Sequence, residues 1–296
     1  MANRPITGLR SVELGVVNVP LHEKFFADTW GLKVAARVGD SVYLRGTGAA
    51  HHIVALTPAS RTELRSVTLS ASSRADVDAL AVRLKAAGVA ITRAPATLEE
   101  PGGGHALSFK DPEGRTFRVV AGDSRHADSA PARDRPERIA HVVLNSPDVA
   151  AATRFFVDTL DFTLSDRTRM MDFVRCNRDH HSIAFAAGDA ATLHHIAFHM
   201  PSLEAVMLGS GRLKDAGFPI EWGVGRHGPG NNVFAYFVAP ESFIVEYTAE
   251  VEQVGDDYVF HGPEHWTWPP GRIDHWGISA PPSSRMKEAQ AHVRCA

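Results

Sequence analysis

The stretch RLKAAGVAI at residues 83–91 returns as RLKDAGFPI at residues 212–220, an offset of 129 positions. Three more pairs recur in the same order, with offsets of 128 to 130 positions: FFADT (25–29) with FFVDT (155–159), HHIVAL (51–56) with HHSIAF (180–185), and DPEG (111–114) with APES (239–242). A period this long that occurs only twice indicates a duplicated domain, whereas a solenoid repeats a short unit many times.

The duplication divides the chain of 296 residues into four parts. We expect a first copy at residues 1–122, a linker at 123–137, a second copy at 138–262 and a tail at 263–296. The linker is polar and contains two prolines, a composition typical of an exposed connection. The tail has no counterpart in the first copy, although it carries three of the five tryptophans.

Composition excludes several classes of protein. Hydrophobic residues make up 44% of the chain and charged residues 22%, which is typical of a folded globular protein and not of a disordered one. The net charge of −3 gives no support for a nucleic-acid surface or a polybasic membrane anchor. No apolar run approaches the roughly 18 residues of a membrane span. With only two cysteines and no signal-peptide pattern at the N-terminus, we expect a cytoplasmic protein.

Each copy shows the same coarse succession of elements. In the second copy, residues 139–146 (IAHVVLNS) form a β-rich run, and Ser146 followed by Pro147 predicts the start of a helix. A second helix is predicted over 203–216 with Gly217 as its stop, and a hairpin over 232–249. The order predicts an α+β fold built from four modules of roughly 60 residues.

The two copies differ in residues that can bind metal. Aligning NVP (18–20) with NSP (145–147), and then the later strands, places three residues opposite Leu14, Ser66 and Arg118: His141, His195 and Glu246. None of the three first-copy residues is a credible metal ligand. Any one of the second-copy residues alone is more often a packing or surface side chain, but their joint absence from the first copy favours ligation.

Strand alternation places these residues on one face. His195 shares its face with Leu193 and Ala197, so His194 is expected to point the other way and only one of the two histidines can enter a site. Glu246 lies within the apolar run FIVEY, where burying a carboxylate is costly unless it is paired or bound to metal. Two imidazoles and one carboxylate are the ligand set of non-haem Fe(II) oxygenases.

The two-domain plan, His141 and three longer runs together resemble the type I extradiol ring-cleaving dioxygenases of the vicinal oxygen chelate superfamily. The runs are CNRDHHSIAF (176–185), LHHIAF (193–198) and the segment 225–247. The resemblance extends over about residues 8–250. It implies tandem duplicated βαβββ modules, which form two domains that are each a curved mixed sheet with helices outside. Two positions depart from the family pattern, Ala235 and Ser242, and the second is expected to strain the hairpin slightly.

The resemblance also implies roles for individual residues. His141, His195 and Glu246 would bind Fe(II), or less often Mn(II), so that the second copy is catalytic and the first is not. The catalytic histidine of the family lies fourteen residues before the second ligand, which is His181; His180 is the competing choice, and alternation favours His181. The first copy keeps a histidine at the matching place, His52.

The implied reaction is extradiol (meta) cleavage of a catechol-type substrate with O2, in the degradation of aromatic compounds. His181, with a pKa near neutrality, would take a proton from the substrate and later return one. His227 and Tyr236 would donate hydrogen bonds and hold the substrate. Arg272 could close over an acidic group of the substrate. It could equally be an ordinary solvated arginine of the tail with no role in binding. Family members form homo-oligomers, which we expect here too.

Two other functions fit the same fold. One is a metal-dependent isomerase or lyase of the glyoxalase type, whose sites usually draw ligands from both copies. The other is a metal-free protein that sequesters small molecules. The lack of ligands in the first copy argues against the isomerase or lyase. The three candidate ligands argue against the metal-free sequestering protein.

Overall fold

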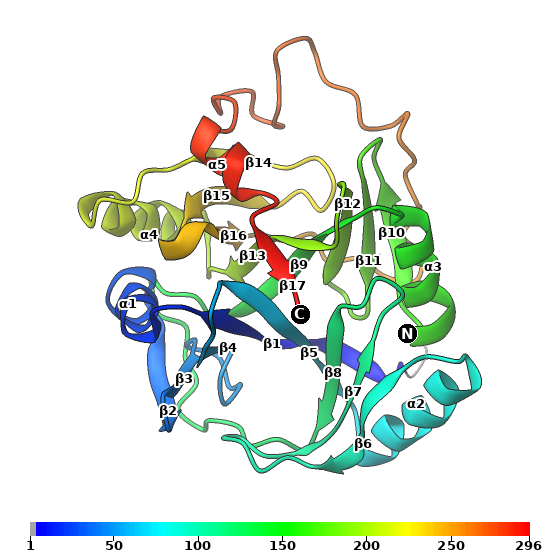
Figure 1. The fold of residues 1–296 in the computed structure, drawn as a ribbon. Helices are drawn as coiled ribbons and strands as arrows, with labels where there is room; N and C mark the ends of the chain where they lie inside the picture. The colour runs from blue at the N-terminus through cyan, green and yellow to red at the C-terminus, as the bar shows by residue number, and fades with distance from the viewer. Residues whose placement is uncertain (1–3) are drawn as a thin grey trace.

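The computed structural model describes residues 4–296 and contains two curved sheets, one from each copy of the repeat (Figure 1). The elements of the first copy are β1 (Ile6–Val16), α1 (Val19–Lys24), the π-helix η1 (Phe25–Trp30), β2 (Lys33–Val38), β3 (Ser41–Arg45), β4 (Val54–Pro58), β5 (Glu63–Ala71), α2 (Arg74–Ala86), β6 (Ile91–Thr97), β7 (His105–Lys110) and β8 (Thr116–Ala121). Its strands are ordered β2-β3-β4-β1-β5-β8-β7-β6.

The second copy repeats this plan. Its elements are β9 (Arg138–Ser146), α3 (Val149–Leu160), β10 (Thr163–Arg167), β11 (Met171–Arg175), β12 (Ile183–Ala187), β13 (Thr192–His199), α4 (Leu203–Asp215), β14 (Trp222–Arg226), β15 (Val233–Val238), the 3-10 turn η2 (Pro240–Ser242) and β16 (Ile244–Ala249). Its strands are ordered β10-β11-β12-β9-β13-β16-β15-β14, the same succession as in the first sheet. The predicted α+β class and duplicated βαβββ modules are confirmed.

The tail joins the two sheets. It contains α5 (Ser284–Ala289) and the short strand β17 (Val293–Cys295). Strand β17 pairs antiparallel with β13 of the second copy and parallel with β5 of the first. The end of the chain therefore lies between the copies, near the centre of the molecule (Figure 1).

Helices cover the outer faces of the sheets, and the apolar core between helices and sheets runs through both copies (Figure 1). On α3, Ala152, Phe156 and Leu160 recur every four residues and are buried. Trp30 of the first copy stacks on Tyr247 of the second, with ring centroids 3.8 Å apart. No helix within residues 4–296 is both long and apolar enough to cross a membrane.

The start of α3 corrects one alignment. Strand β9 runs on through Ser146, and the helix cap is Asp148, whose side chain accepts a hydrogen bond from the Ala151 N–H. The cap of α1 is Asn18, so the equivalent caps lie 130 residues apart, and the match of NVP with NSP is three residues out of register.

Sheet register gives the correct counterpart of His141. His141 pairs with Ala197 across the second sheet, and Ser11 pairs with Thr68 at the same place in the first. The residue opposite His141 is therefore Ser11, and not Leu14 as the short sequence match suggested. The contrast between the copies is unchanged, because a serine does not replace an imidazole.

Candidate metal centre and active site

The candidate ligands His141, His195 and Glu246 lie on three neighbouring strands at the centre of the second sheet: β9, β13 and β16. Oε2 of Glu246 is 3.2 Å from Nε2 of His141 and 3.1 Å from Nε2 of His195. The two Nε2 atoms are 3.4 Å apart, and one ligand atom of each residue falls within 4.8 Å of the others. The structure thus brings the three residues to a common point.

The register of the sheet explains this convergence. Strand β13 lies between β9 and β16, and its residue Ala197 pairs with His141 on one side and with Glu246 on the other. His195 is two positions before Ala197, so one pleat of the central strand supplies the third ligand. All three side chains are buried.

The protonation states of the candidate ligands favour the binding of a cation. Burial by itself would raise the pKa of Glu246, but His141 and His195 outweigh this and hold the pKa of the carboxyl well below its usual range. Burial lowers the pKa of His195. An ionised carboxylate and a neutral imidazole are the forms that bind metal.

The same residues pass a test of fit for a divalent metal. Within residues 4–296, the ion-pair contacts of the buried Glu246 are all to histidines, with no lysine or arginine among them. Burying a carboxylate fully is costly unless a positive charge or hydrogen-bond donors compensate it. Two imidazole nitrogens and a carboxylate oxygen are donors that Fe(II) and Mn(II) accept.

His181 lies beside this centre. It precedes the first residue of β12 by two positions, and its ring centroid is 4.3 Å from that of His141. Burial, together with the neighbouring histidines, lowers the pKa of His181 well below its usual range. This corrects the expectation of a pKa near neutrality: in this structure His181 is a neutral base at physiological pH.

His227 and Tyr236 form a hydrogen-bonded pair on the other side. The Nε2 atom of His227 is 2.9 Å from the Tyr236 hydroxyl, and the ring of Tyr236 meets that of His195 edge-on at 5.1 Å. Burial lowers the pKa of His227 to about 4 and raises the pKa of Tyr236 well above its usual value. Both side chains are therefore neutral at physiological pH, and the tyrosine keeps its proton.

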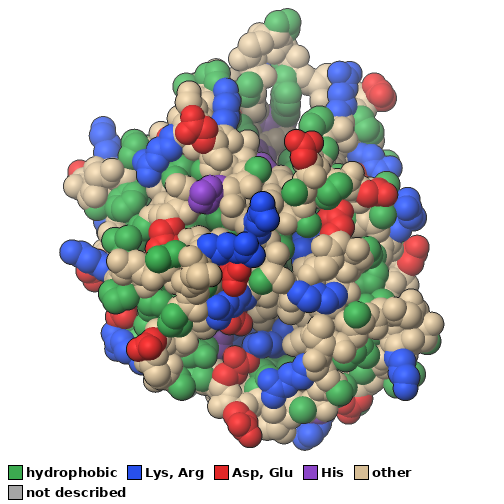
Figure 2. All heavy atoms as spheres, viewed as in Figure 1, with side chains coloured by type: hydrophobic (Ala, Val, Ile, Leu, Met, Phe, Trp, Pro, Cys, Tyr) green, Lys and Arg blue, Asp and Glu red, His purple; other side chains and the backbone are tan. Residues whose placement is uncertain are grey.

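These six residues surround one cavity of about 210 Å3, which five of them line directly while Glu246 lies beneath. The remaining wall is mainly apolar: Val143, Met171, Phe173, Trp222 and Pro229. Figure 2 shows histidine side chains at the bottom of a recess below the tail. No lysine, arginine or acidic residue lines the cavity within the described part of the chain.

Sequence reasoning missed the apolar wall and four polar residues of the cavity, which are Thr168, His194, Asn232 and Gln290. His194 was expected to point away, but a bulge between Leu193 and His195 breaks the alternation, and both histidines line the cavity. Asn232 donates to Oγ1 of Thr248 at 2.7 Å and lies 3.5 Å from Oε1 of Glu246.

Gln290 comes from the tail, just after α5, and no spacing in the sequence pointed to it. Arg272, the tail residue that was considered for substrate binding, is exposed and is not part of the cavity wall. The structure therefore does not bring Arg272 to the other candidate residues.

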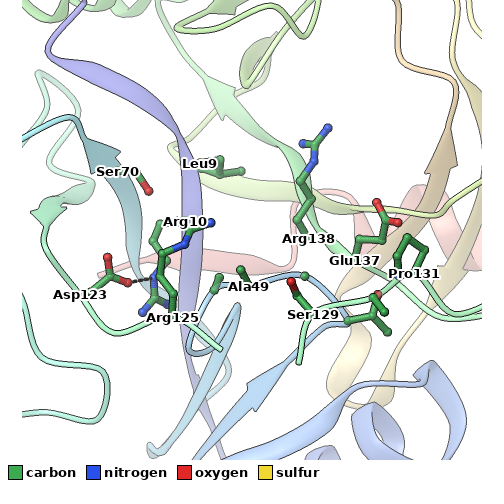
Figure 3. Close-up of a pocket in the computed structure, with 14 residues that line it drawn as sticks. Leu9, Arg10, Ala49, Ser70, Asp123, Arg125, Ser129, Pro131, Glu137 and Arg138 are labelled. Carbon is green, nitrogen blue, oxygen red and sulfur yellow. Dashed lines mark hydrogen bonds and ion pairs between the residues drawn. The ribbon is translucent and has the colours of Figure 1, made fainter. Parts of the chain in front are cut away.

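A second, larger cavity of about 340 Å3 lies between the first copy, the linker and the start of the second copy (Figure 3). Its polar wall contains an ion pair of Arg10 with Asp123 at 2.8 Å. None of the predicted site residues lines it. The smaller cavity is therefore the candidate active site.

Comparison with known proteins places the chain beside enzymes of two kinds. The family model described as Glyoxalase/Bleomycin resistance protein/Dioxygenase superfamily matches residues 8–119 and again 138–247. Metapyrocatechase 2 of Cupriavidus necator is 29% identical over 67% of this chain and 68% of its own length. The iron-dependent extradiol dioxygenase of Rhodococcus jostii (strain RHA1) is 26% identical over 77% of this chain and 85% of its own.

One solved structure is more similar in sequence. The Mn(II)-bound glyoxalase from Novosphingobium aromaticivorans is 38% identical and superimposes with a TM-score of 0.88, over 95% of this chain and 94% of its own. The two matched segments of the family model coincide with the two copies of the repeat, so the duplication read from the sequence is the duplication of this family.

Proposed function

This chain belongs to the Glyoxalase/Bleomycin resistance protein/Dioxygenase superfamily, and on that basis we propose that it is an extradiol dioxygenase that cleaves a catechol-type substrate with O2. The observation that carries the proposal is the convergence of His141, His195 and Glu246 at the base of a mostly apolar cavity. Such a facial triad leaves coordination positions open for two reactants.

His141, His195 and Glu246 would hold Fe(II), or alternatively Mn(II). When bound, the metal supplies Lewis acidity toward the substrate hydroxyls and the redox chemistry that activates O2. Glu246 offers one negative charge, and imidazoles bind metals as uncharged ligands, so a divalent cation held there would keep a net positive charge toward an anionic catechol.

His181 acts as the proton acceptor and donor. It lies beside ligand His141 and is neutral, so its ring can take a proton from a substrate hydroxyl held at the base of the cavity. His227 and Tyr236 act as a unit, because each fixes the orientation of the other through their 2.9 Å contact. The Tyr236 hydroxyl, which keeps its proton, then holds substrate oxygens in place.

The cavity wall supports a substrate class. Val143, Met171, Phe173 and Trp222 offer apolar and aromatic surface, and among the described residues no cationic side chain lines the wall to pair with a carboxylate. A catechol with an alkyl or aryl substituent fits this wall better than an acidic one, because a buried unpaired carboxylate is costly.

The remaining proposals concern organisation. Residues 1–122 form a non-catalytic half, 123–137 a linker, 138–262 the catalytic half and 263–296 a tail that closes the cavity through Gln290. We place the protein in the cytoplasm as a homo-oligomer that acts in the breakdown of aromatic compounds.

A second candidate is a metal-dependent isomerase or lyase, favoured by the likeness to the Novosphingobium glyoxalase. In this chain all three candidate ligands come from the second copy, and their counterparts Ser11, Ser66 and Arg118 supply none. An isomerase that draws ligands from both copies would not fit this arrangement.

The test is anaerobic loading with Fe(II), followed by oxygen-electrode traces with 3-methylcatechol and 2,3-dihydroxybiphenyl. We expect O2 uptake in equal amount to substrate and a coloured ring-opened product. Parallel assays with a glutathione hemithioacetal examine the isomerase. Isomerisation without O2 uptake would overturn the dioxygenase, and tight catechol binding by metal-free protein without turnover would indicate sequestration.

A further inference from the structure

Behind His181 lies a buried chain of hydrogen bonds that the proposed reaction does not by itself require. The Nδ1 atoms of His181 and its neighbour His180 are 3.1 Å apart. On its other side, Nε2 of His180 lies 2.7 Å from Oδ2 of Asp166. The side chains of His180 and Asp166 are fully buried. This places a carboxylate two hydrogen bonds away from the candidate proton acceptor.

Asp166 is held as a carboxylate by its surroundings. It accepts a hydrogen bond from the Tyr258 hydroxyl at 3.0 Å and from the backbone N–H of His261 at 2.9 Å. Burial alone would raise the pKa of Asp166, but its contacts with His180, His261 and Tyr258 lower it overall. The group therefore accepts hydrogen bonds and donates none.

This fixes where the protons lie along the chain. Because the carboxylate only accepts, Nε2 of His180 must carry the proton of the 2.7 Å contact. In the uncharged form of His180 the Nδ1 atom is then an acceptor, and in that form the proton between the two rings belongs to Nδ1 of His181. The Nε2 atom of His181 is left unprotonated and available to the cavity that His181 lines.

The first copy provides an internal comparison. It keeps the histidine pair His51 and His52, with the same 3.1 Å distance between Nδ1 atoms. Its second histidine also meets an aromatic ring edge-on, Tyr43, as His181 meets Phe173. The pair and its packing therefore belong to the shared fold and do not by themselves indicate chemistry.

The carboxylate is what differs between the copies. Asp166 pairs with Phe173 across the second sheet, and the residue that pairs with Tyr43 in the first is Ala36. Within residues 4–296, no carboxylate contacts the ring of His51, which instead stacks on His126. The copy that has the metal ligands also has Asp166, and the copy that lacks them has alanine.

We propose that His180 and Asp166 are positioning residues, which hold the ring of His181 and fix the tautomer that presents an unprotonated Nε2 to the substrate. The inference rests on the proposed dioxygenase function. A carboxylate behind a histidine base has the same effect in other enzymes, where its replacement by an amide yields the wrong tautomer.

The experiment is a double-mutant cycle between Asp166→Asn and His181→Asn in the Fe(II)-loaded protein. We expect Asp166→Asn to lower kcat by at least about tenfold, with KM and metal content close to wild type, because only the proton acceptor is affected. In the His181→Asn background the same change should have no further effect on kcat, since Asp166 acts only through His181. His51→Asn is the matched control and should leave kcat unchanged.

Two outcomes would overturn the proposal. They are an unchanged kcat in Asp166→Asn, or an equal loss with and without His181, which would indicate a structural role. If Asp166→Asn loses its fold or its metal, His180→Asn enters the same cycle, since it removes the Nε2 donor and keeps a small side chain. O2 uptake by wild-type protein is measured in parallel, so failure of the dioxygenase function is distinguished from failure of the positioning role.

Discussion

Glu246 is a fully buried carboxylate whose ion-pair contacts, within residues 4–296, are to histidines. In an apolar interior, such a group is stabilised by a cation, by protonation or by hydrogen-bond donors. Its neighbours lower its pKa, so protonation is disfavoured. A divalent metal bound by Glu246 and the two imidazoles would balance the charge with ligands that it accepts.

Removal of this carboxylate should therefore remove the metal. We expect Glu246→Ala to retain less than about a tenth of the wild-type iron after dialysis, since ligand loss weakens binding strongly. Elemental analysis of purified protein measures this directly. Glu250→Ala, which removes an exposed glutamate one residue beyond the same strand, should keep full iron content. A fully loaded Glu246→Ala protein would refute the ligand assignment.

His181 should affect turnover without affecting the metal. We expect His181→Asn to bind Fe(II) as wild type does and to lose roughly 10²–10⁴-fold in kcat, the usual contribution of a positioned acid–base group. The measurement is steady-state O2 uptake together with iron content. Turnover equal to wild type would remove His181 from the mechanism.

At the residue scale, the three candidate ligands could be singled out from the sequence because the other copy of the repeat lacks them. Prediction failed where local geometry departed from ideal alternation, as at His194, and where the tail supplied a side chain, as with Gln290. Asp166 was not predicted as a site residue either. Its hydrogen-bond partner His180 is fourteen residues away in the sequence and comes close to it only in the folded sheet.

Among the elements, the loop between β14 and β15 packs against the histidine pair. Gly230 has a φ of +78°, and a Cβ there would lie 3.1 Å from Cε1 of His181 and 3.2 Å from Nδ1 of His180. The loop thus needs glycine for its backbone conformation and also for the space that the two rings occupy.

A matched pair of glycines separates these two needs. Gly271 has a φ of +80°, but a Cβ at this position would meet no atom within 4 Å. We expect Gly230→Ala and Gly271→Ala both to lower the free energy of unfolding by about 1 kcal/mol, because alanine tolerates this conformation poorly. Only Gly230→Ala should also lower kcat, since it displaces His181. Urea denaturation and O2 uptake give the two values, and equal kcat in both variants would contradict this account.

Most elements could be predicted from the periodicity of apolar residues and from their stop signals. Gly217, with a φ of +87°, follows the end of α4 where the sequence placed it. Ser242 has a φ of +63°, in agreement with the strain expected at this turn. The start of α3 was predicted too early, because the sequence NSP at 145–147 is typical of a helix cap and first turn. In the structure, β9 continues through Ser146 and the helix begins later.

At the scale of the whole molecule, equivalent turns form hydrogen bonds between the two copies. Glu113, in the turn DPEG of the first copy, accepts hydrogen bonds from the Ser146 hydroxyl and the Asp148 N–H, just before α3. Glu241, in the turn APES of the second copy, accepts from the N–H groups of Val17 and Asn18, just before α1. The repeated turn therefore joins each copy to the other in the same way, and the contacts of Glu113 and Glu241 are together called the clamp. In the sequence these turns were visible only as the match of DPEG with APES.

The clamp should contribute measurable, pH-dependent stability. Oε2 of Glu241 is 3.0 Å from the Val17 N–H, Oε1 is 2.9 Å from the Asn18 N–H, and the Thr62 hydroxyl also donates to the carboxylate. Burial by itself would raise the pKa of Glu241, but these hydrogen bonds and the nearby His22 lower it overall. We expect Glu241→Gln to lower the free energy of unfolding by about 1–2 kcal/mol at pH 7, because a charge-assisted hydrogen bond contributes about that much.

The sign of the pH dependence follows from the lowered pKa. The folded state binds a proton at Glu241 less readily than the unfolded state, so the stabilisation is complete above the unfolded value of about 4.3 and is lost as the pH falls through the lower folded value. The difference between wild type and Glu241→Gln should therefore be constant from about pH 6 to 8 and shrink below about pH 4. Urea denaturation over this range measures it. The exposed Glu204, paired with Arg133, serves as control, since Glu204→Gln should change stability by less than about 0.5 kcal/mol. A Glu241→Gln protein as stable as wild type at pH 7 would show that the contacts of Glu241 do not contribute to holding the copies together.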